Sequence, residues 1–128
     1  MSLLLDTHVF LWWLVDDPQL SRDARATIAD SSVMAFVSAA SLWEAEIKTA
    51  LGRLELDVDV IDLAAEVTGN GFVELPITGR YTRTAATLPP HHNDPFDRML
   101  IAQAIVDDLR LVTADQIIGR YVIHVLST

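Results

Sequence analysis

Apolar and polar residues follow one another along the chain in blocks that predict a regular succession of strands and helices. Short, continuously apolar runs bounded by turn residues are typical of strands that are buried on both faces of a sheet. Such runs predict strands over residues 2–6, 33–38, 72–77, 110–115 (with its turn) and 121–126. Segments with helical spacing lie between these runs and predict helices over residues 7–15, 22–30, 38–52, 58–71, 79–88 and 95–108.

Capping signals mark where two of these helices begin. Asp94 stands directly before Pro95, and this pair is a strong helix start because proline is favoured at the first helical position. We therefore assign Asp94 a structural role only. For the helix over residues 38–52, Ser38 competes with Ser41 as the N-cap, because Ser41-x-x-Glu44 also matches a capping box.

The alternation of strands and helices predicts the fold class. Continuously apolar strands separated by helices form a parallel sheet that is covered on both faces. We therefore expect an α/β fold, a three-layer α/β/α sandwich with a central parallel sheet. The chain of 128 residues is long enough to bury a substantial core, and we expect one domain over residues 1–128. Ligands of such folds bind at the carboxyl ends of the strands.

Composition narrows the classes of function. The formal net charge is −9, from 18 acidic and 9 basic residues, which disfavours a surface that coats nucleic acid. It still allows an enzyme that acts on nucleic acid through carboxylate-bound Mg²⁺. The absence of cysteine excludes disulfides and thiolate metal sites. No apolar run reaches the roughly 18 residues of a membrane span, and the start MSLLLD lacks a signal-peptide pattern. We therefore expect a cytoplasmic protein without membrane association.

Four acidic residues on separate segments are predicted to meet at the carboxyl edge of the sheet. Asp6 ends the first predicted strand, and Asp115 follows the fourth. Glu44 lies early in the helix that leaves the second strand. Asp97 lies in the first turn of the last helix, which starts at the same edge if the preceding connection returns the chain there. Clustered carboxylates repel one another unless a cation compensates, so the group predicts a site for Mg²⁺ or Mn²⁺.

Each of these acids also fits a structural role when it is taken alone. Asp6 and Asp97 suit the start of a helix, Glu44 suits the capping box, and Asp115 suits a turn. Thr113 could orient a metal-bound water or a phosphate, or it could cap the following turn. Capping does not require all four acids to share one edge, so the group as a whole favours a metal site.

Other polar and aromatic residues are expected to be structural. His91 and His92 stand in a proline-rich loop, where we expect both side chains to be solvated. His8 is interpreted as a packed or edge histidine and Arg98 as a partner in a surface ion pair. We expect Trp43 to pack in the core, because tryptophan buries a large apolar area.

Four segments together resemble a known family. An opening strand, a first acid and the following helix are matched by LLLDTHVFLWWL (3–14), and a second-acid helix by SAASLWEAEIK (38–48). A D-x-x-[LI]-A-x-A helix is matched by HHNDPFDRMLIAQA (91–104), and a fourth-acid segment by LVTAD (111–115). In this order and nearly end to end, they make the chain resemble a PIN domain, more narrowly a VapC-type ribonuclease toxin of type II toxin–antitoxin systems.

The resemblance implies a PIN-like fold and an endoribonuclease that depends on Mg²⁺ or Mn²⁺. It implies that Asp6, Glu44, Asp97 and Asp115 are the acids of the site and the metal ligands, with Thr113 in the fourth motif. It also implies a homodimer that is neutralised by a small antitoxin covering the acidic groove. We therefore predict hydrolysis of RNA phosphodiesters by a metal-activated water.

Three alternatives stay open. A PIN nuclease could act in RNA processing outside toxin–antitoxin systems. A non-catalytic module could use the acidic groove to bind a basic peptide. A phosphoryl-transfer enzyme with Asp6 as its nucleophile is disfavoured, because the sequence Asp6-Thr7-His8 lacks the D-x-D pattern usual in haloacid-dehalogenase-type phosphatases.

Overall fold

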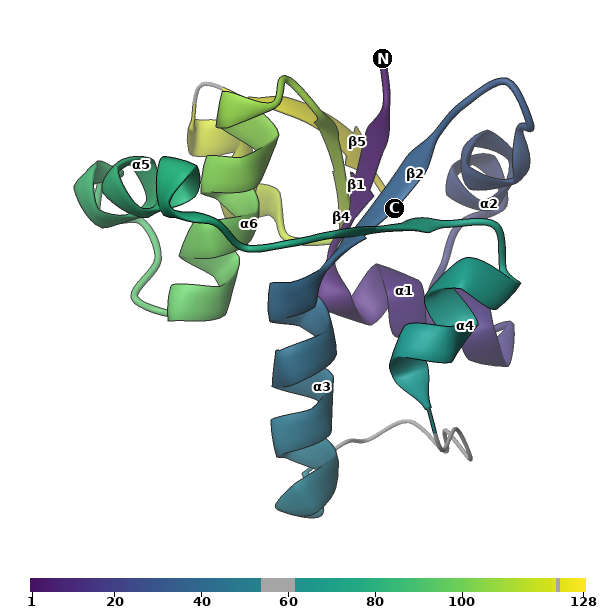
Figure 1. Cartoon of the computed structure of the whole chain (residues 1–128). Coiled ribbons are helices and arrows are strands. Elements are labelled where there is room, and N and C mark those ends of the chain that lie inside the picture. The colour runs from purple at the N-terminus through teal and green to yellow at the C-terminus, as the bar shows by residue number, and fades with distance from the viewer. Residues whose placement is uncertain (54–61, 122) are drawn as a thin grey trace.

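One parallel sheet forms the centre of the molecule (Figure 1). The computed structural model describes residues 1–53, 62–121 and 123–128. Within them the strands are β1 (Leu3–Leu5), β2 (Ala35–Ser38), β3 (Val73–Leu75), β4 (Arg110–Thr113) and β5 (His124–Ser127). Their order in the sheet is β3-β2-β1-β4-β5, and all neighbouring pairs are parallel. The predicted parallel sheet is therefore confirmed, with β1 at its centre.

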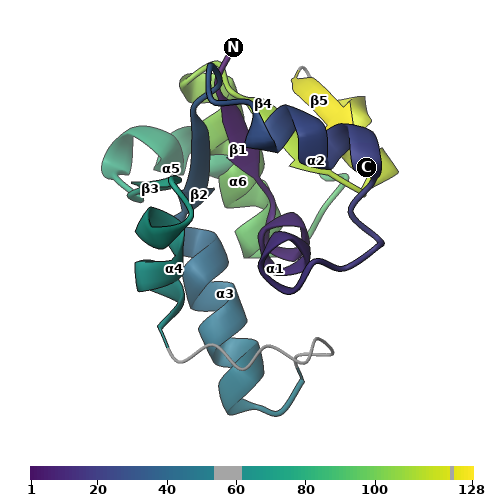
Figure 2. The ribbon, with the colours of Figure 1, turned by 90° about the vertical axis from the view of Figure 1, so that its right-hand side faces the viewer.

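Helices cover both faces of this sheet. The described helices are α1 (Thr7–Val15), α2 (Arg22–Ala29), α3 (Ala39–Ala50), α4 (Leu63–Gly69), α5 (Thr82–Thr87) and α6 (Pro95–Val106), with the 3₁₀ helices η1 (Gly79–Tyr81) and η2 (Gln116–Arg120). Figures 1 and 2 show α5 and α6 on one side of the sheet and α1, α2 and α4 on the other. This is the predicted three-layer sandwich. None of the helices in the described part of the chain could cross a membrane.

The core lies in two layers because side chains alternate across a strand. Leu3 and Leu5 are buried in the cluster with the helices α1, α2 and α4. Leu4, between them, belongs to the cluster on the opposite face with α6, where it packs with Ile101. Burial on both faces explains why the strands read as continuously apolar runs.

The connection before α6 returns the chain to the carboxyl edge of the sheet. Figure 1 shows α1 and α3 leaving that edge and α6 starting near it. The prediction that Asp97 lies at this edge required the connection to return the chain there, and the structure confirms that it does. Three helix N-termini meet here, and their caps are the side chains of Asp6, Ser38 and Asp94.

The ends of several elements differ from the prediction. The predicted strand 72–77 is observed only over Val73–Leu75, since Pro76 has no N–H to continue the ladder. The predicted helix 58–71 is observed as α4, and its first part, 58–61, lies outside the described residues. The predicted strand 121–126 is observed as β5, which starts at His124, and residue 122 also lies outside them.

The start of α3 decides between the two competing caps. Ser38 is the N-cap, and its hydroxyl accepts a 3.0 Å hydrogen bond from the N–H of Ala40. The hydroxyl of Ser41 is buried without a hydrogen-bond partner among the described residues. The capping box was therefore wrong, and the Glu44 side chain is directed elsewhere.

Candidate functional site

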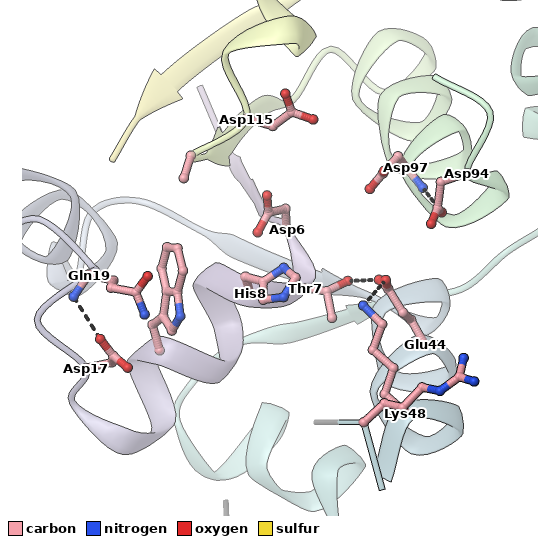
Figure 3. Close-up of a pocket in the computed structure, with 13 residues that line it drawn as sticks. Asp6, Thr7, His8, Asp17, Gln19, Glu44, Lys48, Asp94, Asp97 and Asp115 are labelled. Carbon is pink, nitrogen blue, oxygen red and sulfur yellow. Dashed lines mark hydrogen bonds and ion pairs between the residues drawn. The ribbon is translucent and has the colours of Figure 1, made fainter. Parts of the chain in front are cut away.

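A cavity of about 710 Å³ opens at the carboxyl edge of the sheet. The four acids that the sequence placed at this edge all line it, namely Asp6, Glu44, Asp97 and Asp115. The cap residue Asp94 lines it as well. Figure 3 shows the carboxylates of Asp6, Asp97 and Asp115 turned toward the same space. The structure thus brings the predicted acids together, while their chemical roles stay a prediction.

Asp6 caps α1 and faces the cavity at the same time. One carboxylate oxygen, Oδ1, accepts a 3.0 Å hydrogen bond from the N–H of Val9. The other, Oδ2, accepts a 2.6 Å hydrogen bond from the Thr113 hydroxyl. Burial raises the pKa of Asp6, and the Thr113 hydrogen bond offsets part of this rise. The cap and the candidate site residue are therefore one side chain.

Thr113 connects two of the acids. Its hydroxyl donates to Asp6 and accepts a 3.0 Å hydrogen bond from the N–H of Asp115. The bond from Asp115 shows that Thr113 caps the turn after β4. The side chain of Thr113 is buried, with 1% of its surface exposed. The structure shows the capping role of Thr113, while its contact with a metal-bound water or a phosphate stays a prediction.

Glu44 is the most deeply buried of the cavity acids, with 6% of its surface exposed. Its Oε1 accepts a 2.6 Å hydrogen bond from the hydroxyl of Thr7, which is also buried. Its Oε2 lies 2.9 Å from the ammonium of Lys48, one helical turn further along α3. A buried carboxylate needs such partners, because burying an unpaired charge is costly. Both oxygens are oriented before any ligand arrives.

Asp97 carries the clearest electrostatic signature of the site. Burial raises its pKa to about 6, and the negative charges of Asp94 and Glu44 add to the effect. Asp94 remains the helix cap, since its Oδ1 accepts hydrogen bonds from the N–H groups of Phe96 at 2.8 Å and Asp97 at 3.1 Å. The cap prediction is confirmed, although the capping carboxylate also adds to the negative field of the cavity.

His92 is a residue whose environment was predicted wrongly. Only 8% of its side chain is exposed, whereas the sequence predicted a solvated histidine. Its Nε2 lies 2.7 Å from Oδ2 of Asp115, and its Nδ1 lies 2.9 Å from the hydroxyl of Tyr121. The neighbouring His91 is exposed as predicted and packs edge-on against the same tyrosine. A proline-rich loop normally indicates exposure, and nothing local in the sequence signals that this one folds over the turn after β4.

Arg98 was predicted to form a surface ion pair, and this was wrong. Its guanidinium donates hydrogen bonds to backbone carbonyls of α5 and the following loop, among them those of Ala85, Leu88, Pro89 and His92. The carbonyls of Ala85 and Leu88 stand at the end of α5, where carbonyls lack partners within the helix. Arg98 therefore fixes the connection that brings α6 to the carboxyl edge.

The prediction for Trp43 was also wrong. The side chain is 60% exposed, and its ring packs edge-on against Phe96 at a centroid distance of 5.3 Å. Trp43 is placed outward because Glu44, the next residue on α3, turns into the cavity. His8 is exposed at the rim of the cavity, where its ring lies 6.0 Å from that of Trp12. This agrees with the interpretation as an edge histidine.

The charges around the cavity fit a hydrated hard cation. The lining of the cavity contains the basic side chains of Lys48 and Arg53, and Lys48 is paired with Glu44. Within the described residues, no three histidine or acidic side chains stand close enough together to enclose a metal ion directly. A hard cation at this position would therefore be held partly through its own waters. A cation would also relieve the repulsion by Asp94 and Glu44, which adds to the effect of burial on the pKa of Asp97.

Fold and site together define a class of protein, a parallel α/β domain with a carboxylate-lined cavity at the carboxyl edge of its sheet. Residues 3–123 match the family described as PIN domain, and the chain belongs to this family. The membership that the four motifs predicted is therefore confirmed.

Known relatives share both sequence and fold with the chain. It is 34% identical over 120 residues to Ribonuclease VapC22 of Mycobacterium tuberculosis, over 90% of this chain and 88% of that protein. VapBC2 from Rickettsia felis, solved with a DNA fragment from its promoter, superposes with a TM-score of 0.67 at 13% identity, covering 99% of this chain and 98% of that one. A toxin–antitoxin complex from Klebsiella pneumoniae gives 0.65 at 16% identity, covering 98% and 97%. The two solved structures establish a common fold.

Proposed function

We propose that this protein is a metal-dependent endoribonuclease and the toxin of a type II toxin–antitoxin pair. The observation that carries the proposal is the cavity at the carboxyl edge, where Asp6, Glu44, Asp97 and Asp115 meet from separate segments of the chain. The similarity to Ribonuclease VapC22 supports the activity, because the alignment spans most of both chains.

The four acids would hold Mg²⁺ or Mn²⁺, directly or through water. When bound, such an ion lowers the pKa of a coordinated water and stabilises negative charge on the attacked phosphodiester. Asp97 must lose its proton to contribute, and its pKa of about 6 leaves it ionised at neutral pH. The repulsion among the acids then becomes a driving force for taking up a cation.

Hydrogen bonds within the chain orient the acids in advance. Thr113 and a backbone N–H hold the two oxygens of Asp6, and Thr7 holds one oxygen of Glu44. Preoriented charges act on a reacting phosphate without the cost of ordering them during the reaction. We therefore assign Thr7 and Thr113 the role of positioning residues rather than direct contacts of the substrate.

The proposed substrate is RNA, whose phosphates must approach an acidic surface. The chain carries a net charge of −9, so the backbone of RNA is repelled until the cavity holds cations. Arg53 and Lys48 line the cavity and would contact phosphate groups near the cleaved bond. Binding of RNA is thus expected to depend on the divalent ion and not on a broad basic face.

The proposed partner is an antitoxin that covers the cavity and places a basic side chain in it. The relative from Klebsiella pneumoniae was solved as a toxin–antitoxin complex, which supports a partner of this kind. The cavity already accepts an ammonium group, that of Lys48, at 2.9 Å from Glu44. A lysine or arginine from a partner would meet the same carboxylates and exclude the metal ion.

We also propose a homodimer that acts in the cytoplasm, where its RNA substrates would be found. Trp43 supports a protein interface, since it exposes 60% of its surface and tryptophan is enriched in such interfaces. Light scattering on the purified chain tests the assembly. A mass of one chain at micromolar concentration would contradict the dimer.

Cleavage of RNA by the purified chain, free of antitoxin, tests the proposed function. We expect cleavage with Mn²⁺ or Mg²⁺, none with a chelator, and a loss of about a hundredfold or more in Asp6→Asn. Asparagine is also a good N-cap, so this variant keeps the start of α1. Asp62→Asn is the matched control, because Asp62 also caps a helix, α4, and is not among the described residues that line the cavity. Unchanged cleavage by Asp6→Asn would contradict the proposal.

The alternative of a non-catalytic module rests on the same cavity, whose acids could bind a basic peptide alone. Calorimetric titration with Mn²⁺ separates the two. A nuclease site binds Mn²⁺ and loses that binding in Asp6→Asn, whereas a peptide site need not bind the ion at all.

A further inference from the structure

His92 and Asp115 form a bonded pair at the edge of the cavity. The two residues are 23 positions apart in sequence, and Nε2 of His92 lies 2.7 Å from Oδ2 of Asp115. The other carboxylate oxygen, Oδ1, accepts a 2.9 Å hydrogen bond from the N–H of Ile117. Asp115 is therefore held at both oxygens, while 34% of its side chain stays exposed toward the cavity.

The direction of these hydrogen bonds follows from the chemistry of the groups. An ionised carboxylate can only accept, so the Nε2–H of His92 donates to Asp115. In the neutral ring, Nδ1 accepts from the hydroxyl of Tyr121. In the doubly protonated ring, Nδ1–H donates to that hydroxyl, whose own proton turns to the Pro89 carbonyl 3.4 Å away. The bond to Asp115 is the same in both forms of the ring.

The backbone of His92 is tied to the helix that carries Asp97. Arg98, the residue after Asp97, donates a 3.1 Å hydrogen bond to the carbonyl of His92 and a 3.2 Å bond to that of Pro89. The backbone of the loop before α6 is thus anchored to the first turn of that helix. The imidazole of the same loop residue, His92, anchors the loop to the turn after β4.

We propose that His92 is a positioning residue that holds the Asp115 carboxylate toward the cavity and sets its place relative to Asp97. The inference rests on the proposed function, since it assigns a support to one ligand of the proposed metal site. Each carboxylate oxygen has two lone pairs, so Asp115 keeps acceptor capacity for an ion or its waters while it is bonded to His92. Partners behind a ligand typically change metal affinity by about 10- to 100-fold.

The direct test is the affinity for Mn²⁺, measured by calorimetry on the whole chain without RNA. His92→Leu removes the donor, and we expect Mn²⁺ binding to weaken by about tenfold or more. His92→Gln places an amide N–H near the position of Nε2, and we expect it to recover most of that loss. His91→Leu is the matched control, because His91 contacts Tyr121 but makes no contact with Asp115 among the described residues. It should bind as the unchanged protein does.

A double-variant cycle distinguishes positioning of Asp115 from a general effect on folding. With Asp115→Asn already present, His92→Leu should cause no further loss of affinity, since the group that it orients is gone. An equal loss in both backgrounds, or unchanged binding by His92→Leu alone, would overturn the inference.

If His92→Leu does not fold, Tyr121→Phe replaces it as the test. That variant frees Nδ1, and we expect a smaller loss that also disappears with Asp115→Asn; unchanged binding would overturn the inference.

Failure of the proposed function has a different signature. In that case the unchanged protein neither binds Mn²⁺ nor cuts RNA. If the unchanged protein does both and the His92 variants match it in Mn²⁺ affinity, the inference fails alone.

Discussion

Lys48 is the residue whose charge opposes a metal ion in the cavity. Its ammonium lies 2.9 Å from Glu44 and is partly exposed, so a cation that approaches Glu44 must compete with it. We expect Lys48→Met to bind Mn²⁺ about threefold more tightly, in line with the small free energy of partly exposed ion pairs. Lys48→Arg keeps the charge and should bind as the unchanged protein does. Weaker Mn²⁺ binding by Lys48→Met than by Lys48→Arg would contradict this role.

Asp97 makes the stability of the metal-free protein depend on pH. Its pKa in the folded protein, about 6, lies above the ordinary value of 3.8, so folding favours the protonated form. This contribution is fully present below pH 4 and is lost as the pH rises through about 6. Asp97→Asn resembles the protonated form at every pH. We therefore expect the variant to melt a few degrees above the unchanged protein at pH 7, with a chelator present, and level with it at pH 4. A difference in Tm that is the same at both values would be inconsistent with the raised pKa.

Two acids and two histidines near the start of α6 show how far the environment of a single residue could be predicted from the sequence. Asp94 and Asp97 follow local rules, since a cap before proline and an acid in the first helical turn depend only on neighbours in sequence. His91 and His92 are identical by those rules, yet one is exposed and the other is buried against Asp115. What separates them is which side of the loop meets the turn after β4, and that contact forms only in the tertiary structure.

At the scale of elements, the connection between α5 and α6 depends on Arg98. Its guanidinium joins backbone carbonyls from Ala85 to His92. We expect Arg98→Met to lower the free energy of unfolding by about 2–4 kcal/mol, because hydrogen bonds to charged groups are worth about 1.5–3 kcal/mol each and do not add fully. Arg83→Met, at an exposed position on α5, is the matched control and should change it by less than about 0.5 kcal/mol. Urea unfolding measures both, and equal values for the two variants would refute the role of Arg98.

The elements themselves were largely predictable, and their ends were less so. The continuous apolar runs around Leu4 and Leu111 predict strands buried on both faces, and the helices between them require parallel pairing. The end of β3 at Leu75 follows from Pro76, a signal that was present in the sequence. The start of β5 at His124 has no such signal in the sequence. It depends on where the chain after the 3₁₀ helix η2 comes to pair with β4.

At the scale of the whole molecule, the fold concentrates negative charge at one edge of the sheet. Parallel strands and their crossover helices bring together Asp6, Glu44, Asp97 and Asp115, which are scattered over most of the sequence. Their convergence could be predicted because the carboxyl ends of parallel strands share an edge. The exposure of Trp43 was not predicted, although a Glu44 that faces the cavity already turns the neighbouring helical position to another side of α3. The central claim is that these acids work as one catalytic unit on RNA.

The measurement that tests this claim most directly is the rate of RNA cleavage in Mn²⁺ by single and double variants. Asp6→Asn and Asp115→Asn remove acids from different strand ends and keep residues that cap their turns. If both acids belong to one unit, the double variant loses no more than the worse single variant, because groups that act together are strongly non-additive. Combining Asp6→Asn with the distant Asp62→Asn should leave the rate of Asp6→Asn unchanged. Losses that multiply in the double variant, or full activity in either single variant, would contradict the account.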